Sequence, residues 1–147
     1  MIIPAELHHL EEIISIENSA FNKPWTRNQI KNDIQSDMDS ENWVYILDDL
    51  VTGYIFGWIV LGEFHLNNIA VHPKYLRRSI GKKLIWHIIS RAISHNIKVI
   101  LLEVSANNIS AQKCYKSLGF NQIGIRKDYY SKGDDAILYN LDLIKNG

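Results

Sequence analysis

Cysteine is nearly absent from this 147-residue sequence, which contains Cys114 and no other. A single cysteine excludes an internal disulfide and any cysteine-rich metal site. An excess of charge of one sign is also missing, because 16 lysines and arginines balance 16 aspartates and glutamates. A chain without a basic excess is poorly suited to general nucleic-acid binding. We therefore expect no direct nucleic-acid partner.

Long apolar runs and a charged-then-apolar N-terminal signal are lacking as well. No segment approaches the ~20 apolar residues that a membrane-spanning helix needs, and the N-terminus has no secretory pattern. We expect a cytoplasmic monomer without a membrane partner. The six histidines show no paired metal-ligand spacing beyond the adjacent His8 and His9. We therefore expect no metal.

The sequence does contain enough apolar material for one packed domain spanning residues 1–147. Hydrophobic residues make up 46% of it and charged residues 22%, a balance typical of globular rather than disordered chains. The chain has no repeats, linkers or low-complexity tracts. A domain of this length can bury a sizeable core.

A basic loop at residues 74–81 lies between an apolar strand end, residues 69–71, and a predicted helix at 79–95. Its one glycine, Gly81, means that it matches neither a Walker A loop nor a dinucleotide fingerprint. The start of a helix presents unpaired N–H groups and the positive end of the helix dipole. Nearby cations are Arg77, Arg78, Lys82 and Lys83. These features indicate a pyrophosphate-binding loop, although an ordinary basic surface turn has the same composition.

Hydrophobic periodicity places strands and helices along the rest of the chain. Strands are expected at residues 1–3, 43–47, 51–61, 64–71, 99–104, 120–126 and 136–143. Helices are expected at residues 6–19, 26–36 and 79–95, and from Asn107 or Asn108 to Gly119. Loops are expected at residues 21–25, 37–42 and 127–134.

The strand–helix–strand unit between residues 64 and 104 should make its two strands parallel. The apolar run at 99–104 should lie in the middle of the sheet, covered on both faces. The predicted fold class is therefore α/β, with a mixed sheet and helices on both faces.

Three polar side chains are candidates for chemistry. Glu103 is a carboxylate within an apolar strand, where a charge is costly unless it is paired or used. It could be a general base or the structural partner of a lysine or arginine. Tyr115 shares a helical stripe with Leu118, as a core aromatic does, but its phenol, with an ordinary pKa of ~10, could also donate a proton. Asn108 fits a plain helix cap.

Five segments together resemble the Gcn5-related N-acetyltransferase (GNAT) superfamily over nearly the whole chain. They are residues 21–26 (FNKPWT), 68–73 with 77–82 (NIAVHP and RRSIGK), 102–104 with 108–111 (LEV and NISA), 115–120 (YKSLGF), and 126–130 with 135–137 (RKDYY and DAI). The first and last segments are similar to those of N-terminal acetyltransferases, and in particular to the bacterial RimI type. The resemblance implies the GNAT fold, a mixed and mostly antiparallel sheet with a splayed central parallel pair.

The resemblance also implies roles for individual residues. Acetyl-CoA would be the co-substrate, and the residues that would bind it are Ile69, Ala70, Val71, Arg77, Arg78, Ser79, Ile80, Gly81, Lys82 and Asn108. Glu103 would be the general base, and Tyr115 would protonate the leaving thiolate. The acceptor would contact Pro24, Trp25, Tyr129 and Tyr130. No metal is implied.

The sequence departs from the superfamily's acetyl-CoA motif at two positions. Leu76 stands where the motif usually has glutamine or arginine, and Ser79 stands at its first glycine. Glycine there allows the backbone to approach a phosphate closely. Serine adds a Cβ, so we expect weaker or slightly shifted binding of acetyl-CoA.

RimI-type enzymes acetylate the N-terminal alanine of the eighteenth protein of the small ribosomal subunit, and the resemblance implies that substrate. The aromatic segments around Trp25 and Tyr129 would narrow the entrance to an extended N-terminus. One alternative is an acetyltransferase for lysine side chains or small amines. Another is a non-catalytic CoA-binding module, which the altered residues Leu76 and Ser79 would favour.

Overall fold

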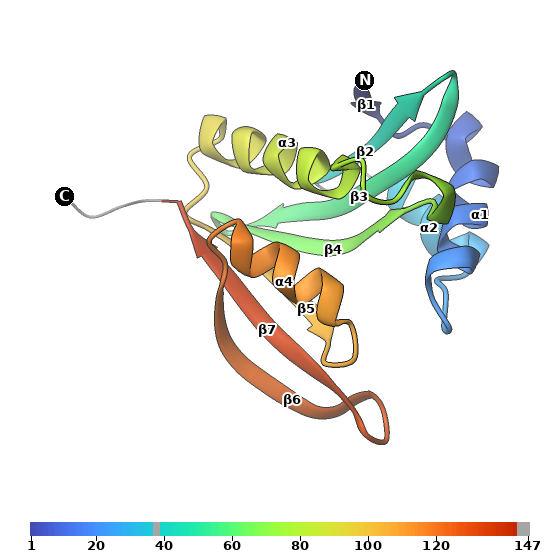
Figure 1. The fold of residues 1–147 in the computed structure, drawn as a ribbon. Helices are drawn as coiled ribbons and strands as arrows, with labels where there is room; N and C mark the ends of the chain where they lie inside the picture. The colour runs from blue at the N-terminus through green and yellow to red at the C-terminus, as the bar shows by residue number, and fades with distance from the viewer. Residues whose placement is uncertain (37–38, 144–147) are drawn as a thin grey trace.

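A computed structural model describes residues 1–36 and 39–143, which form a seven-stranded sheet with helices on both faces (Figure 1). The strands are β1 Ile2–Pro4, β2 Ser40–Leu47, β3 Leu50–Val60, β4 Glu63–Val71, β5 Val99–Ser105, β6 Asn121–Ser131 and β7 Asp134–Asp142. The α-helices are α1 Leu10–Ala20, α2 Arg27–Ile34, α3 Ile80–Ser94 and α4 Ile109–Ser117, with short 3-10 turns at Leu7–His9 and Pro73–Tyr75. Within the described ranges, no helix is long and apolar enough to span a membrane.

The strands lie in the order β1-β2-β3-β4-β5-β7-β6, and β4 and β5 are the parallel pair among the described strands. This confirms the predicted mixed sheet and the parallel strands on either side of α3. The pairing of β4 with β5 begins with Glu63 opposite Val99 and ends with Leu66 opposite Leu102. Beyond that point the two strands separate, and the sheet is splayed as predicted (Figure 1).

A β-bulge in β4 lies where the separation begins. Phe56 of β3 faces Asn68, whereas the next residue, Gly57, faces Leu66. Asn67 is therefore an extra residue in β4, and such an insertion bends a strand and increases its twist. The bulge turns the last residues of β4 away from β5 and opens the gap between them.

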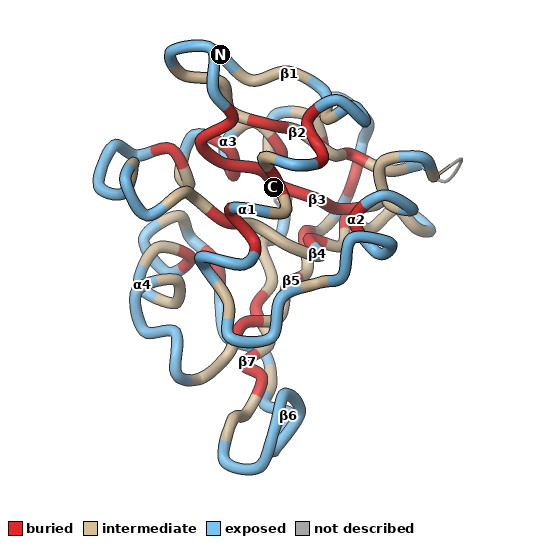
Figure 2. Tube along the Cα trace, turned by 90° about the vertical axis from the view of Figure 1, so that its right-hand side faces the viewer, coloured by how far each residue is buried: buried red, intermediate tan, exposed pale blue. Residues whose placement is uncertain are grey.

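The two faces of the sheet carry separate cores. Under α3 and α4, the buried side chains include Ile80, Leu84, Ile88, Ile100, Leu102 and Tyr139. On the opposite face, α1 and α2 pack over β2, β3 and β4, and the buried side chains include Ile13, Ile16, Ile30, Val44 and Tyr54. Figure 2 shows buried segments along β2 and β3 and in part of β7, while most of β6 is exposed.

The expectation that residues 99–104 are covered on both faces is wrong. Burial alternates along β5, with Ile100, Leu102 and Val104 buried in the core under α3 and α4 and the residues between them only partly buried. Because α1 and α2 pack over β2 to β4, the second face of β5 has no comparable helical cover among the described residues. Glu103 lies on this less covered face.

Local capping signals set the start of α2 where the sequence predicts it. Thr26 Oγ1 accepts a hydrogen bond from the Gln29 backbone N–H at 3.2 Å, and Gln29 Oε1 accepts one from the Thr26 N–H at 2.8 Å. This is the expected capping box. The helix ends at Ile34, two residues earlier than predicted.

Two predicted loops are partly wrong. Of the loop expected at 37–42, residues 37–38 lie outside the described residues, and β2 already begins at Ser40. The loop expected at 127–134 is mostly strand, because β6 continues to Ser131 and only a short turn precedes β7. The strand pairing is irregular between Arg126 and Ser131, and Asp128 has a φ of 53°. A polar segment with irregular pairing lacks the alternating pattern that indicates a strand.

Candidate active site

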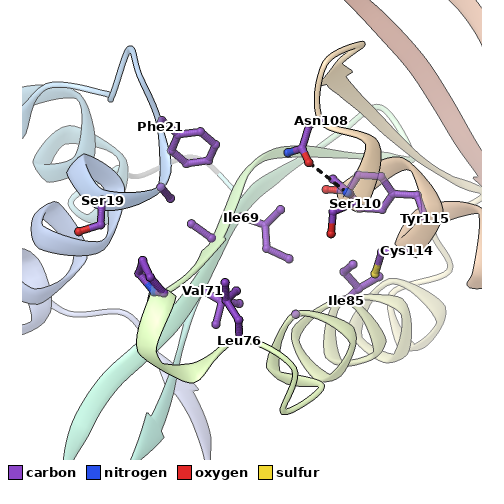
Figure 3. Close-up of a pocket in the computed structure, with 15 residues that line it drawn as sticks. Ser19, Phe21, Ile69, Val71, Leu76, Ile85, Asn108, Ser110, Cys114 and Tyr115 are labelled. Atoms are coloured by element: carbon purple, nitrogen blue, oxygen red, sulfur yellow. Dashed lines mark hydrogen bonds between the residues drawn. The ribbon is translucent and has the colours of Figure 1, made fainter.

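A cavity of about 450 Å³ lies where β4 and β5 separate, and it is bounded by the end of α1, β4, the loop before α3, and α4 (Figure 3). Its lining residues are Ser19, Ala20, Phe21, Ile69, Ala70, Val71, Pro73, Leu76, Gly81, Ile85, Asn108, Ser110, Ala111, Cys114 and Tyr115. The structure therefore brings together six residues for which the sequence predicted a role, namely Ile69, Ala70, Val71, Gly81, Asn108 and Tyr115. Four of them belong to the end of β4 and the start of α3, and Asn108 and Tyr115 belong to α4 and its cap. The βαβ crossover places β5, which leads into α4, beside β4.

A second cavity of about 310 Å³ adjoins the first at the N-terminus of α3. The two cavities share the lining residues Val71, Leu76, Gly81, Ser110 and Cys114. The second is also lined by Arg77, Ser79, Ile80 and Lys82. Free N–H groups of the first helical turn and two cations therefore face one hollow, which is the arrangement that binds a phosphate group.

Arg78 differs from Arg77 and Lys82, because it lines neither cavity, and the same is true of Lys83. The guanidinium carbon of Arg78 lies 5.3 Å from the centre of the ring of Tyr75, a residue that lines the second cavity, in a cation–π contact. Of the two adjacent arginines, Arg77 is therefore the one positioned to contact an anion in the second cavity.

The backbone of the basic loop explains why glycine suits position 79. Ser79, which occupies the N-cap position of α3, has a φ of 61°, and Arg77 has a φ of 66°. Residues with a Cβ are disfavoured in this left-handed region. The Ser79 hydroxyl makes no side-chain cap hydrogen bond. Serine thus bears a conformational cost here without capping the helix.

Gly81 shows that the shared wall of the cavities has room for a ligand. A Cβ added at Gly81 would meet Val71 Cγ2 at 3.8 Å, an ordinary van der Waals contact, and no other atom within 4 Å. A side chain there would extend into the cavity rather than into the protein. The residues present therefore fit an extended ligand that carries phosphates at one end.

Glu103 lies on β5 directly after the last residue that pairs with β4. Its Oε1 lies 3.5 Å from Arg126 Nη2, and its side chain is 29% exposed. The structural alternative, pairing with an arginine, is thus present in the structure. Both partners are partly exposed to solvent. Glu103 lines neither cavity, so the structure does not bring the candidate base to the cavity walls with the other predicted site residues. Its burial was overestimated because no helix within residues 1–36 and 39–143 covers the second face of β5.

Tyr115 lies on α4, is 5% exposed and lines the larger cavity. Its ring centre lies 5.7 Å from that of Phe120 and 6.2 Å from that of Tyr139. Burial raises the pKa of the Tyr115 phenol well above its ordinary value. The phenol is therefore neutral at physiological pH and can act as a proton donor. Burial likewise raises the pKa of the Cys114 thiol beside it.

The two aromatic segments predicted to bind the acceptor approach each other across the sheet. Lys23 Nζ donates a hydrogen bond of 3.4 Å to the carbonyl oxygen of Tyr130, 107 residues away in the sequence. Trp25 is partly buried, and Pro24 is exposed. Burial, and then the charge of Glu103, raises the pKa of Tyr130 to about 12, which places Tyr130 within electrostatic reach of the candidate base.

The residue that sequence reasoning missed at this end of the site is Arg126. Besides pairing with Glu103, its guanidinium carbon lies 5.4 Å from the ring centre of Tyr129. Arg126 thus links the candidate base to Tyr129, an aromatic side chain predicted to contact the acceptor. Its presence in the RKDYY segment was the available signal. Phe21 was likewise quoted in a motif but not assigned to the cavity that it lines.

Metal chemistry was not expected from the sequence. Over residues 1–36 and 39–143, no three histidine, cysteine, aspartate or glutamate side chains are grouped so that they could hold a metal ion. The metal-free reaction stays a prediction.

Comparison with known proteins identifies the family. Residues 10–120 match the model of the acetyltransferase (GNAT) family. The chain is 34% identical over 124 residues to the ribosomal protein bS18-alanine N-acetyltransferase of Haemophilus ducreyi, covering 84% of each chain. It is 33% identical over 135 residues to the Haemophilus influenzae protein of that name, covering 90% of this chain and 88% of the other. The chain belongs to the acetyltransferase (GNAT) family.

A solved structure agrees with this result. The crystal structure of the ribosomal-protein-S18-alanine N-acetyltransferase from Escherichia coli superimposes with a TM-score of 0.91. The alignment covers 100% of this chain and 96% of the other, at 29% sequence identity. The GNAT fold predicted from the sequence is thus confirmed.

Proposed function

We propose that this protein transfers the acetyl group of acetyl-CoA to the N-terminal alanine of ribosomal protein bS18. The observation that carries the proposal is the continuity of the two cavities, which leads from a cationic helix N-terminus to Tyr115. Relatives that match most of the chain carry the name of this activity. The expected monomeric state and cytoplasmic location stay predictions.

The end of β4 is suited to bind the pantetheine arm of acetyl-CoA. Ile69, Ala70 and Val71 pair with β3 on one side only, because pairing with β5 ends at Leu66. Backbone N–H and C=O groups that point into the gap are therefore available, and an extended ligand can bond to them as a neighbouring strand would. Asn108 and Gly81 would lie beside the arm.

The second cavity would hold the pyrophosphate. The free N–H groups at the start of α3 would donate hydrogen bonds to it, and Arg77 and Lys82 would supply the opposite charge. Arg78, which the sequence assigned to this role, would contribute mainly to the general positive potential of the loop.

Acetyl-CoA supplies an activated acyl group, the carbonyl of its thioester. An N-terminal α-ammonium has a pKa of about 7.7–8.0, so it is largely protonated at neutral pH and does not attack. Glu103 would accept one of its protons, directly or through water. The new N–C bond would form and the C–S bond would break, with Tyr115 donating its phenolic proton to the leaving sulfur. The second proton that the nitrogen loses would return to the Tyr115 oxygen, directly or through water, and restore the phenol. A backbone N–H in the cleft would stabilise the oxyanion.

The acceptor would enter between the two aromatic segments. Lys23 joins them by its hydrogen bond to the carbonyl oxygen of Tyr130. Trp25 lies close to Lys23 in one segment, and Tyr129 directly precedes Tyr130 in the other. A passage closed in this way would admit an extended N-terminus more readily than a lysine within a folded chain. A small first residue such as alanine would fit beside Tyr115.

A screen of peptides that share the sequence of the bS18 N-terminus and differ in their first residue tests the proposal. Mass spectrometry should detect acetylation, with alanine the preferred first residue. Transfer to an internal lysine alone would instead support the lysine acetyltransferase. Binding of acetyl-CoA without transfer to any amine would support the non-catalytic module.

A further inference from the structure

Glu17, in the last turn of α1, is a buried carboxylate with no part in the chemistry proposed above. It is 1% exposed, and a charge buried to that extent is costly unless hydrogen bonds satisfy it. Its partners are neutral donors from three separate segments. Oε1 accepts hydrogen bonds from Tyr54 Oη at 2.6 Å and from Asn68 Nδ2, and Oε2 accepts one from the Trp25 backbone N–H at 3.3 Å.

The two oxygens of Glu17 are attached to different parts of the molecule. Oε1 bonds to β3 through Tyr54 and to the bulge of β4 through Asn68. Oε2 bonds to the segment of residues 21–25, which is named here the acceptor segment. The backbone oxygen of Glu17 also accepts from the N–H of Phe21 at 3.1 Å. Both ends of the acceptor segment are therefore hydrogen-bonded to Glu17.

Of these parts, the acceptor segment has the fewest other restraints. β3 and β4 pair with each other along most of their length, and β3 also pairs with β2. Residues 21–25 belong to no helix or strand. Besides their bonds to Glu17, they are held by the packing of Phe21 and Trp25 against the core and by the Lys23 hydrogen bond. Loss of Glu17 should therefore displace the acceptor segment and leave the end of β4 in place.

We infer that Glu17 is a positioning residue that fixes the acceptor segment against the strand that binds the co-substrate. The inference rests on the proposed function, in which Trp25 contacts an incoming peptide N-terminus. Glu17 does not touch the reacting atoms. Its role is to hold Trp25 and Phe21 at the mouth of the larger cavity, which Phe21 lines.

Two substitutions and a matched control test this role. Glu17→Met fills a similar volume but has no oxygen at the positions of Oε1 and Oε2 to accept these hydrogen bonds. It should raise the KM for an alanine-starting peptide about tenfold, less than the ~10²-fold that a 1 Å misplacement can cost, and leave the Kd for acetyl-CoA within about twofold. In Glu17→Gln, the side-chain oxygen can still accept from the Trp25 N–H. Its NH2 group can donate to the Tyr54 oxygen and to the oxygen of a flipped Asn68 amide. The KM for the peptide should therefore stay within about threefold of wild type.

Glu12 provides the control, because it lies on the same helix and its Oε2 accepts from the Val51 backbone N–H at 2.7 Å, away from the acceptor segment. Glu12→Met should lower the thermal stability without changing the KM for the peptide. The inference is wrong if Glu17→Met leaves that KM unchanged, or if it raises the Kd for acetyl-CoA as much as the KM.

Amide hydrogen exchange gives a readout that does not require the correct acceptor. In Glu17→Met, the Trp25 amide should exchange at least about tenfold faster, while the amides of residues 69–71 keep their protection. If the wild-type protein acetylates no peptide but this exchange pattern is found, the proposed function fails and the positioning role stands. Unchanged exchange at Trp25 would overturn the inference even in an active enzyme.

Discussion

Glu103 Oε1 lies 3.5 Å from Arg126 Nη2, so the candidate base is held by a cation from the neighbouring hairpin. The same guanidinium stacks over Tyr129. Both partners are partly exposed, and ion pairs of that kind contribute roughly 0–1 kcal/mol to stability. The contact is therefore more important for orienting two side chains of the site than for holding the fold together.

Replacing Arg126 should separate these two effects. Arg126→Ala should change the free energy of unfolding by less than about 1 kcal/mol. It should raise the KM for an alanine-starting peptide several-fold, because Tyr129 loses its stacking partner and Glu103 its orientation. Arg126→Lys keeps the charge but not the planar stacking group and should restore the activity only in part. Lys127→Ala, next to it on β6, is the control, and equal kinetics in the Arg126 and Lys127 variants would contradict the assignment.

The two adjacent arginines of the basic loop should differ in their effect on acetyl-CoA binding. Arg77→Ala should weaken binding at low salt by up to about 1.5–3 kcal/mol, the usual contribution of a charge-assisted hydrogen bond. The loss should shrink at high salt. Arg78→Ala should weaken binding much less, because Arg78 lines neither cavity. Calorimetry at low and high salt concentration measures the affinity of each variant for acetyl-CoA. Equal losses of affinity in the two variants would contradict the different roles given to Arg77 and Arg78.

The left-handed backbone at Ser79 predicts that glycine is the better residue there. Ser79→Gly should raise the free energy of unfolding by up to about 1 kcal/mol and leave acetyl-CoA binding equal or tighter. Ser90→Gly, at an exposed position within the same helix, should instead lower stability by roughly a few tenths of a kcal/mol. Chemical denaturation compares the two variants. A large loss of affinity in Ser79→Gly would show that the hydroxyl itself binds phosphate.

Features encoded by neighbouring residues were predicted well from the sequence. The capping box of Thr26 and Gln29, the Asn108 cap and the crossover through α3 each depend on a short stretch of chain. The Asn108 side chain accepts from the Ala111 N–H at 3.1 Å, as a cap should. The motif residues of β4 and α4 line one cavity because the crossover rule alone brings their segments together.

Features that depend on distant contacts could not be predicted in this way. Glu103 was expected to be deeply buried, but the cover of β5 depends on where α1 and α2 pack, which periodicity does not specify. The bridge from Lys23 to Tyr130 and the contacts of Glu17 join segments that share no local pattern. Tyr129 and Tyr130 were placed in a loop because the irregular pairing of β6 hides the strand pattern.

The buried phenol of Tyr115 makes a prediction about pH. Because burial raises its pKa above the ordinary value of ~10, Tyr115 should stay protonated throughout the usual assay range. As the pH is raised to about 10, deprotonation of this phenol should therefore cause no decrease in the rate. Tyr115→Phe should reduce turnover about 10²-fold while acetyl-CoA binding is retained. A rate that falls as the pH is raised toward about 9, in wild type but not in Tyr115→Phe, would contradict the assignment.

The role of Glu103 as a base predicts both a loss of activity and its partial recovery. Glu103→Gln keeps the shape of the side chain, so the fold should be preserved. Its rate should fall by about 10²–10⁴-fold at neutral pH, the usual contribution of a general base. Part of the rate should return at high pH, because the α-amine then loses its proton without help. A loss that is the same at every pH would indicate a structural role instead.

The most direct measurement follows acetyl transfer by mass spectrometry to two forms of one peptide, with wild-type protein and with Glu103→Gln. One form begins with a free alanine, and the other is blocked at its N-terminus and carries an internal lysine. Wild-type protein should acetylate the free alanine and leave the blocked peptide nearly unmodified, and Glu103→Gln should modify both poorly at neutral pH. Equal acetylation of the two peptides, or a wild-type rate in Glu103→Gln, would contradict the account.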